Sequence, residues 1–261
     1  MRKTSLLAIA AFGAAVGMFA QAGPQYGPPM AQRGFAGPGP MGMGMDRGKV
    51  VLGLPYTADV SNSVVQTLAD GNTISRTTAG HVARDSQGRT YMKEDISGGP
   101  WAQKTGSTMT FISDPVAGYA YVLDAERKVA VRREFKPRNA DHSLMRPDGA
   151  GPFSPDAKDR VESDLGSQQI NGVTAAGKSV TRTIPAGAIG NAQPIVAKTE
   201  IWTSPDLQVV VLSKRNDPRM GQSTYSLNNI QRVEPNAALF QIPSDYTVQD
   251  APAFPKRPDA R

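Results

Sequence analysis

The 261-residue sequence contains no cysteine. It therefore has no disulfide, no thiolate nucleophile and no cysteine-based metal site. Attachment of a lipid to a cysteine behind a leader peptide is excluded as well. The stability of the fold must come from burial of apolar side chains and from pairing of the backbone.

Histidine is almost as scarce, since His81 and His142 are the two in the chain. The G-x-S-x-G and H-E-x-x-H motifs are missing, and the acidic residues are scattered among turns. His81 is predicted to be a hydrogen-bonded structural residue within a strand. We therefore predict no catalytic residue, no metal site and no cofactor, so the chain is not expected to be an enzyme.

A strong or clustered excess of one charge is also lacking. The formal net charge is +6, from 29 lysines and arginines against 23 acidic residues, and the two signs are interspersed along the chain. A protein that binds nucleic acid gathers its basic residues on one stripe. The pattern predicts a mixed, solvated surface and no nucleic-acid partner.

The apolar run at the N-terminus follows a basic pair, Arg2 and Lys3, and extends from Leu6 to Ala20. It ends in Ala20-Gln21-Ala22, a small-x-small exit. These are the parts of a signal peptide, here residues 1–22, and the run is short for a membrane span. We predict cleavage after Ala22, no transmembrane segment in the mature chain, and a periplasmic or secreted protein. An uncleaved N-terminal anchor is the alternative.

Two segments of low complexity flank a central domain. Residues 23–48 consist largely of Gly, Pro and Met, and residues 249–261 form a Pro-rich tail. The folded domain is therefore predicted to span residues 49–248. The alternating methionines Met41, Met43 and Met45 could ligate Cu(I) through their sulfur atoms, but a low-complexity linker is the favoured interpretation and we predict no metal there.

The central region is rich in strand signals. Asp70-Gly71 and Asn171-Gly172 are strong hairpin turns, and no segment keeps an apolar helical period over three turns. The sequence thus predicts a nearly all-β chain of about ten strands with little helix, at most one turn near Asn236 to Phe240. The expected strands are Thr57–Ala69, Thr73–Arg84, Arg89–Asp95, Ser107–Ser113, Gly118–Leu123, Lys128–Glu134, a segment from about Glu162 to Asn171, Gly177–Ile184, Ile195–Thr203, Leu207–Asp217 and Thr224–Val233.

The C-terminal half carries a family resemblance. A strand with Glu200-Ile201-Trp202 is followed by Pro205-Asp206-Leu207, by Val209-Val210-Val211 and by Thr224 to Ile230, and the pattern finishes with Leu-Phe-Gln-Ile-Pro-Ser-Asp-Tyr at residues 239–246. This order resembles the end of LolA/RseB-like periplasmic proteins and is similar to uncharacterised secreted proteins of acidobacterial type. The resemblance implies a curved antiparallel sheet, an incompletely closed (half) barrel, whose concave face binds a lipophilic ligand.

Aromatic residues make up 7% of the chain, and a few of them suggest where such a ligand would lie. Tyr119 and Tyr121 project from one face of a strand, and Trp202 and Val211 lie on later strands. A role in the core or between sheets is the first interpretation of the aromatic side chains, and lining a lipophilic groove is the second. If the concave face binds a ligand, we expect Tyr119, Tyr121, Trp202 and Val211 to line the groove, with the Lys136 to Asp159 loop at its mouth.

The sequence therefore favours a non-catalytic binding module for lipophilic ligands, similar to a lipid or lipoprotein carrier. The alternative is an envelope module that binds another protein as a sensor or scaffold, by adding a strand to an exposed sheet edge. The oligomeric state is not predicted.

Overall fold

The fold is a single sheet of twelve strands. The computed structural model describes residues 50–95, 108–137 and 159–252, all within the compact unit Phe35–Arg261. The strands are β1 (Tyr56–Thr67), β2 (Thr73–Arg84), β3 (Thr90–Asp95), β4 (Thr108–Asp114), β5 (Tyr119–Asp124), β6 (Val129–Glu134), β7 (Arg160–Ile170), β8 (Val173–Ile184), β9 (Ile195–Ser204), β10 (Val209–Asp217), β11 (Gly221–Gln231) and β12 (Thr247–Asp250). A single 3₁₀ turn, η4 (Ala237–Phe240), precedes β12.

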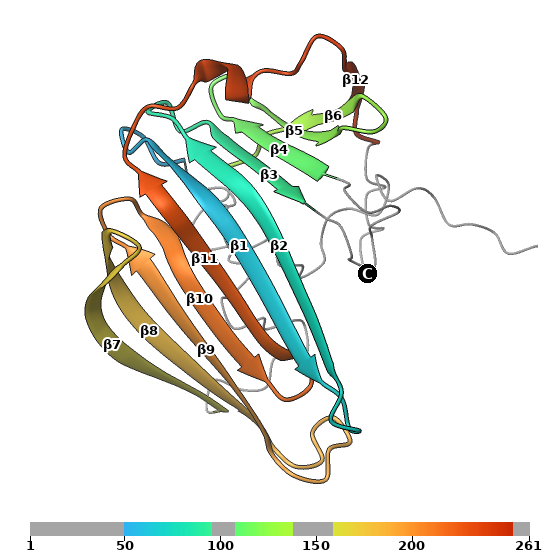
Figure 1. The fold of residues 1–261 in the computed structure, drawn as a ribbon, viewed down its shortest axis with the longest axis vertical. Helices are drawn as coiled ribbons and strands as arrows, with labels where there is room; N and C mark the ends of the chain where they lie inside the picture. Colours follow the sequence, from blue (N-terminus) through green and yellow to red (C-terminus); the bar gives the residue numbers. More distant parts are fainter. Residues whose placement is uncertain (1–49, 96–107, 138–158, 253–261) are drawn as a thin grey trace, which may run out of the picture. The chain divides into compact units, whose positions relative to one another are not determined.

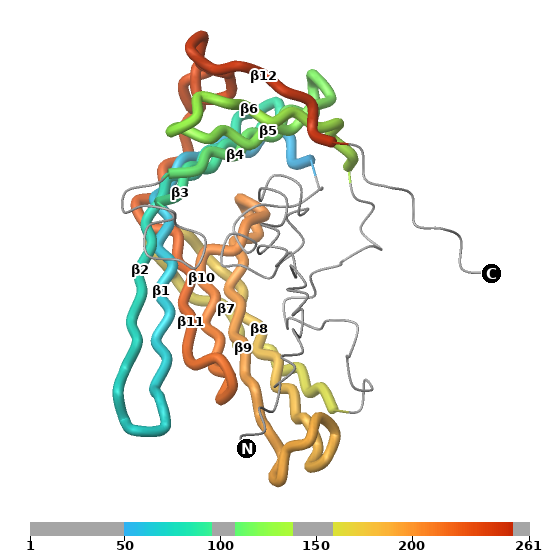
Figure 2. The backbone as a smooth tube through the Cα atoms, turned by 90° about the vertical axis from the view of Figure 1, so that its right-hand side faces the viewer, coloured from blue at the N-terminus to red at the C-terminus, as the bar shows by residue number. Residues whose placement is uncertain are grey.

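The strand order is β12-β6-β5-β4-β3-β2-β1-β11-β10-β9-β8-β7. Neighbouring strands are antiparallel except β12, which lies parallel to β6. The sheet is curved and its two edge strands do not meet (Figures 1 and 2). The predicted all-β, incompletely closed half-barrel with little helix is confirmed. The sequence did not predict β12, which includes Gln249 and Asp250 of the expected tail.

Short turns produce this series of hairpins. Gly71 has φ of +83° after Asp70, so it adopts a conformation that a side chain would strain, and its N–H donates to the Leu68 carbonyl at 3.0 Å. Asn171 and Gly172 both have positive φ and close the β7–β8 hairpin, as their residue types predict. Local pairing of this kind builds β1 to β6 and β7 to β11 separately, and the β1–β11 ladder joins the two sets.

Because side chains alternate along a strand, each ladder divides the sheet into two faces. We call one the Val60 face: it carries Val60 with its cross-strand partner Leu227, and Ala58 with its partner Val82. We call the other the Tyr121 face: the register Tyr121–Ile112–Tyr91 continues through Ala83 to Thr57.

The buried apolar residues form two clusters. The larger one contains Val60, Met92, Trp202, Val211 and Leu227 among its members. The smaller one is formed by Ile112, Leu123 and Ala130 on the Tyr121 face, and Tyr91, Tyr121, Ile242 and Tyr246 pack against it. The segment that follows η4 therefore covers the part of the Tyr121 face formed by β3 to β6.

The residues of the C-terminal sequence pattern hold this architecture. Trp202 lies over Gly177 of the neighbouring strand β8, where an added Cβ would come within 2.5 Å of the indole ring. Phe240 of η4 is buried and lies under the Arg89 guanidinium, 4.9 Å from the ring centroid. The residues that carry the family resemblance therefore have structural roles in this chain.

The two edges of the sheet differ in length. β12 has four exposed residues, and its Asp250 is bonded to Arg132 of β6 at 2.8 Å. β7 is 11 residues long and mostly exposed, and a bulge at Asp164 to Gly166 interrupts its ladder with β8. A bulge and charged residues are features that limit strand addition at an edge. Within residues 50–95, 108–137 and 159–252, no helix has the length and apolar character needed to cross a bilayer.

Replacing Gly177 with alanine is expected to destabilise the fold, because the new methyl group overlaps the Trp202 ring. Overpacking of this kind costs about 1–3 kcal/mol of the free energy of unfolding, measurable by urea denaturation. In a Trp202→Phe background, where the ring is smaller, the same Gly177→Ala substitution should lower the free energy of unfolding by less than it does in the parent protein. Equal losses in both backgrounds would show that the ring contact is not the cause.

Candidate functional site

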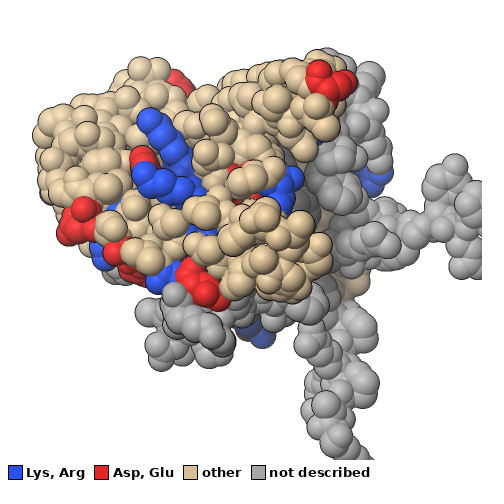
Figure 3. All heavy atoms as spheres, turned by 90° about the horizontal axis from the view of Figure 1, so that it is seen from below, with Lys and Arg blue, Asp and Glu red and all other residues tan. Residues whose placement is uncertain are grey.

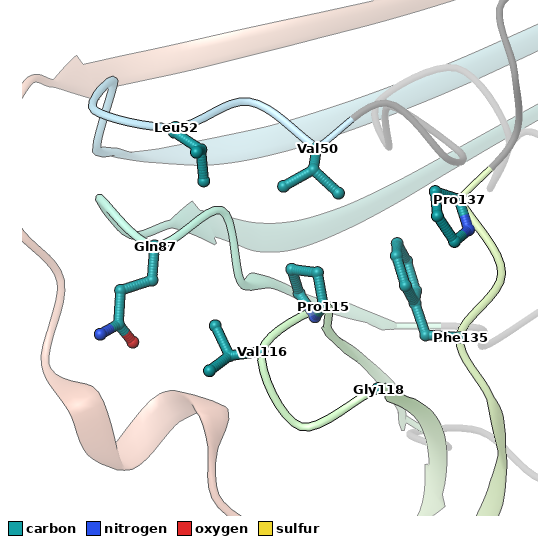
Figure 4. Close-up of a pocket in the computed structure, with 8 residues that line it drawn as sticks. All are labelled: Val50, Leu52, Gln87, Pro115, Val116, Gly118, Phe135 and Pro137. Atoms are coloured by element: carbon teal, nitrogen blue, oxygen red, sulfur yellow. The ribbon is translucent and has the colours of Figure 1, made fainter.

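A pocket of about 370 Å³ lies at the end of the sheet where β2, β4 and β6 finish. Figure 4 shows its walls, which come from the segment before β1, the β2–β3 turn, the β4–β5 turn and the residues after β6. It is lined by Val50, Leu52, Gln87, Pro115, Val116, Gly118, Phe135 and Pro137. Gln87 contributes the polar side chain of this set. The pocket is a depression open to solvent with mainly apolar walls, and its volume lies within the range of sites for small ligands.

Backbone hydrogen bonds hold these walls in place. Gly53 N–H donates to the Ser86 carbonyl at 2.9 Å, which fastens the segment before β1 to the β2–β3 turn. Phe135 N–H donates to the Gly118 carbonyl at 2.9 Å, which fastens the end of β6 to the β4–β5 turn. These hydrogen bonds therefore connect the four wall segments in two pairs.

Two turn residues shape the pocket further. The carboxylate of Asp85 accepts hydrogen bonds from the Gln87 and Arg89 N–H groups at 3.0 and 2.8 Å, which fixes the β2–β3 turn. Gly88 has φ of +80°, and an added Cβ would lie 2.7 Å from Val50 Cγ1. Glycine is thus needed there both for the backbone and for the seating of Val50.

The Val60 face presents an apolar row beside this end of the sheet. Six cross-strand partners on β1 to β6 form it: Ala58, Val82, Met92, Phe111, Val122 and Val131. The first three are buried and the last three are partly exposed. The row therefore leaves apolar surface open over β4 to β6.

Polar side chains follow this row along the strands of the same face. Ser213 on β10 lies opposite Tyr225 on β11, and Tyr225 lies opposite Asn62 on β1. Asn62 Nδ2 donates to Oε1 of Glu94 on β3 at 3.1 Å. Gly80 of β2 lies between them in the sheet, and a Cβ there would come within 3.1 Å of Glu94 Cγ. We call Asn62, Glu94, Ser213 and Tyr225 the polar cluster.

Burial changes the protonation of two members of this cluster. It raises the pKa of Glu94, because the charged carboxylate loses its hydration, and the hydrogen bond from Asn62 offsets this in part. It also raises the pKa of Tyr225 well above its usual range, and the nearby Tyr56 and Glu94 add to the effect. Burial therefore disfavours the charged form of both side chains.

The structure does not bring the four predicted groove residues together. Tyr119 and Tyr121 belong to the Tyr121 face, with ring centroids 6.4 Å apart, and the Arg132 guanidinium lies 4.9 Å from the centroid of Tyr119. Val211 is fully buried and Trp202 is 8% exposed, both within the larger core cluster. Of the expected loop at the mouth, residues 138–158 lie outside the described residues, as do Met41, Met43, Met45 and His142.

Sequence reasoning missed both the pocket and the polar cluster. The pocket is formed by four separate loops, and the spacing of its residues in the sequence does not predict it. A weak signal for the cluster exists, since Glu94 follows Met92 at an alternate position of one strand, and Asn62 likewise follows Val60.

Within the described ranges, no group of three or more His, Asp or Glu residues is placed to hold a metal ion. His81 Nδ1 lies 3.2 Å from Asp59 Oδ1, as expected for a hydrogen-bonded structural histidine. On the face shown in Figure 3, acidic and basic residues are mixed, as the sequence predicts.

Comparisons with known proteins give matches among solved structures alone, since no family model and no curated protein matches the sequence. An uncharacterised conserved protein from Thermus thermophilus is similar at 11% identity and a TM-score of 0.42, covering 76% of this chain and 91% of that one. MucB in the MucA/MucB complex from Pseudomonas aeruginosa is similar at 10% identity and a TM-score of 0.36, covering 74% and 58%.

A LolA superfamily protein from Nitrosomonas europaea is also similar, at 8% identity and a TM-score of 0.31, covering 72% of this chain and 90% of that one. At these identities and scores, no ligand and no residue role is transferred from these proteins.

The raised pKa of Glu94 predicts a pH-dependent effect of its replacement. A carboxyl group whose pKa is raised on folding favours the folded state below its unfolded pKa, and that contribution is lost as the pH rises through the folded value. The isosteric Glu94→Gln stays neutral and keeps an oxygen for Asn62. We expect the free energy of unfolding of Glu94→Gln, relative to the parent protein, to increase between pH 4 and pH 7.

The matched control is Glu134→Gln, because the side chain of Glu134 is 71% exposed. The difference in free energy of unfolding between Glu134→Gln and the parent protein should not grow between pH 4 and pH 7. A difference for Glu94→Gln that stays constant, or that falls with rising pH, would contradict a pKa of Glu94 that is raised by burial.

Proposed function

We propose that this protein is a non-catalytic binding module for a ligand with an apolar group, and that the pocket at the end of β2, β4 and β6 receives that group. The observation that carries the proposal is the pocket itself: about 370 Å³, with seven of its eight lining residues apolar or glycine. Leu52 and Val116 line it and are 65% and 66% exposed. Covering such surface is favourable by about 25 cal/mol per Å².

Two further features support this proposal. The walls are held by hydrogen bonds between turns, so little ordering is required when a ligand enters. The apolar row leaves Phe111, Val122 and Val131 partly exposed on strands β4 to β6, of which β4 and β6 end at the pocket and β5 begins beside it. Lipophilic molecules of small or linear shape are the class that fits these surfaces best.

A charge placed in the pocket should abolish its affinity for an apolar probe. We expect Val116→Asp to weaken binding of the uncharged fluorophore N-phenyl-1-naphthylamine by about tenfold or more, because the carboxylate would lose hydration beside the probe. Fluorescence titration of the purified protein measures this effect.

The matched control is Val196→Asp, since Val196 on β9 is 50% exposed and does not line the pocket. It should bind the probe like the parent protein. Equal affinities for the parent and Val116→Asp would show that the pocket is not the site, and the absence of any probe binding by the parent would contradict the proposed function.

A second function, capture of a protein partner by strand addition, is favoured by one feature, the length of the edge strand β7. Its 11 residues present one unpaired edge among the described residues. The bulge at Asp164 to Gly166 restricts an added strand to the shorter stretches on either side of it. Recovery of one defined protein from envelope extracts, lost when Ser167 or Gln169 is replaced by proline, would favour this function over ligand binding.

We also propose that the protein acts outside the cytoplasm, in the periplasm or as a secreted protein. The N-terminal Arg2-Lys3, the apolar run and the Ala20-Gln21-Ala22 exit support this. N-terminal sequencing of the protein recovered from a bacterial envelope fraction should begin at Gly23. An Ala22→Leu variant should accumulate uncleaved, and an intact Met1 on the parent protein would contradict cleavage.

A further inference from the structure

The described part of the chain begins at the pocket itself. Val50 is the first described residue, and Figure 4 shows it on the pocket wall together with Leu52. Val51 between them is 5% exposed, whereas Leu52 is 65% exposed. Residues 50–52 therefore alternate as in an extended chain, with Val50 and Leu52 toward the pocket and Val51 toward the core. The preceding part of the chain joins the domain at this wall.

The sequence before Val50 has the pattern of a hairpin that would fold back on this wall. Asp46-Arg47-Gly48-Lys49 suits a four-residue turn, because glycine in the third position supplies the positive φ that type I′ and type II turns require there. A turn that pairs residue 46 with residue 49 would place Met45 opposite Val50. Two residues further along each strand, Met43 would lie opposite Leu52. Opposite residues of an antiparallel pair share a face, so both methionines would point into the pocket.

The methionine side chains fit the pocket in chemistry as well as in position. Methionine is unbranched and adapts to irregular apolar surfaces, and seven of the eight lining residues are apolar or glycine. The charged residues of the segment, Asp46, Arg47 and Lys49, all fall in the turn and would stay in water. A low-complexity linker does not require methionine at every second position. A strand that inserts one face into an apolar pocket is expected to alternate in this way.

We propose that Met43 and Met45 occupy the apolar pocket of their own chain, and that a ligand has to displace them. This inference rests on the proposed function, because the methionines hold the place of the ligand's apolar group. They are attached a few residues from the pocket, so their effective concentration there is on the order of millimolar. The apparent affinity for a ligand is then reduced in proportion to the fraction of molecules whose pocket is open. The segment 41–49 thereby sets the ligand concentration at which the pocket fills.

The first test removes the methionines and measures binding of N-phenyl-1-naphthylamine to the purified protein. We expect the triple variant Met41→Ser/Met43→Ser/Met45→Ser to bind this probe about three- to tenfold more tightly than the parent protein, because competition within the chain is lost. The control replaces Met30, which lies upstream of the alternating run, and Met220, which is 58% exposed on the turn between β10 and β11. Met30→Ser/Met220→Ser should bind the probe like the parent protein.

The second test does not depend on a ligand. The chain lacks cysteine, so one introduced pair of cysteines reports one contact. A disulfide forms when the two Cα atoms lie within about 7 Å and the Cβ atoms face each other. We expect Met43→Cys/Val116→Cys to crosslink severalfold faster under mild oxidation than Gly42→Cys/Val116→Cys or Gly44→Cys/Val116→Cys, whose cysteines would lie on the opposite face of the segment. A segment that only passes near the pocket would give equal rates at residues 42, 43 and 44.

The outcomes separate this inference from the proposed function. If the parent protein binds the probe and the triple methionine variant binds it no more tightly, the inference is overturned and the proposed function stands. A gain in affinity for Phe254→Ser, with none for the triple variant, would assign the pocket to the C-terminal end of the chain and would also overturn the inference.

If neither the parent protein nor the triple variant binds the probe, the proposed function fails. The crosslinking rates then decide the contact by themselves. A faster pair at residue 43 supports the methionines in the pocket, and equal rates at residues 42, 43 and 44 overturn that contact as well.

Discussion

The alternation of side chains across one continuous ladder is the constraint on which this structure depends. Twelve strands pair in a single sheet, and no disulfide can assist them because the chain lacks cysteine. Each strand therefore has to satisfy two faces at once, one toward Val60 and one toward Tyr121. The segment after η4 covers part of the Tyr121 face, whereas the Val60 face combines a core, an open apolar row and a buried polar cluster.

This arrangement separates the surface proposed for binding from the surface that packs in the core. Hydrogen bonds fix the backbone near the β2–β3 turn, beside the pocket. Arg84 donates to the Leu54 carbonyl at 2.9 Å, and the Asp85 carboxylate accepts a hydrogen bond within the turn. The long hairpins β1–β2 and β7–β8 extend away from that corner in Figure 1. A pocket built on fixed turns would lose little conformational entropy on filling, as the proposed binding function requires.

The sequence predicted most strands because their signals are local. Asp70-Gly71 and Asn171-Gly172 close tight turns wherever the rest of the chain goes, and alternation marks the strands around them. β12 was missed since its four residues are exposed and carry no apolar period. Whether Tyr119, Tyr121, Trp202 and Val211 share a face depends on the registers between distant strands, which the sequence does not specify. Tyr121 and Val60 are separated by four ladders, and a one-residue difference in any of them exchanges the faces.

The central seam of the sheet has a consequence for how the chain acquires its structure. Val60 on the first strand pairs with Leu227 on the eleventh, so this ladder forms only after nearly the whole domain has been synthesised. The hairpins on either side are sequence-local and can form early, whereas closure of the seam carries the entropy of a very long loop. The protein should therefore fold slowly for its size, with both halves preformed and their exposed borders open to misassembly until the seam closes.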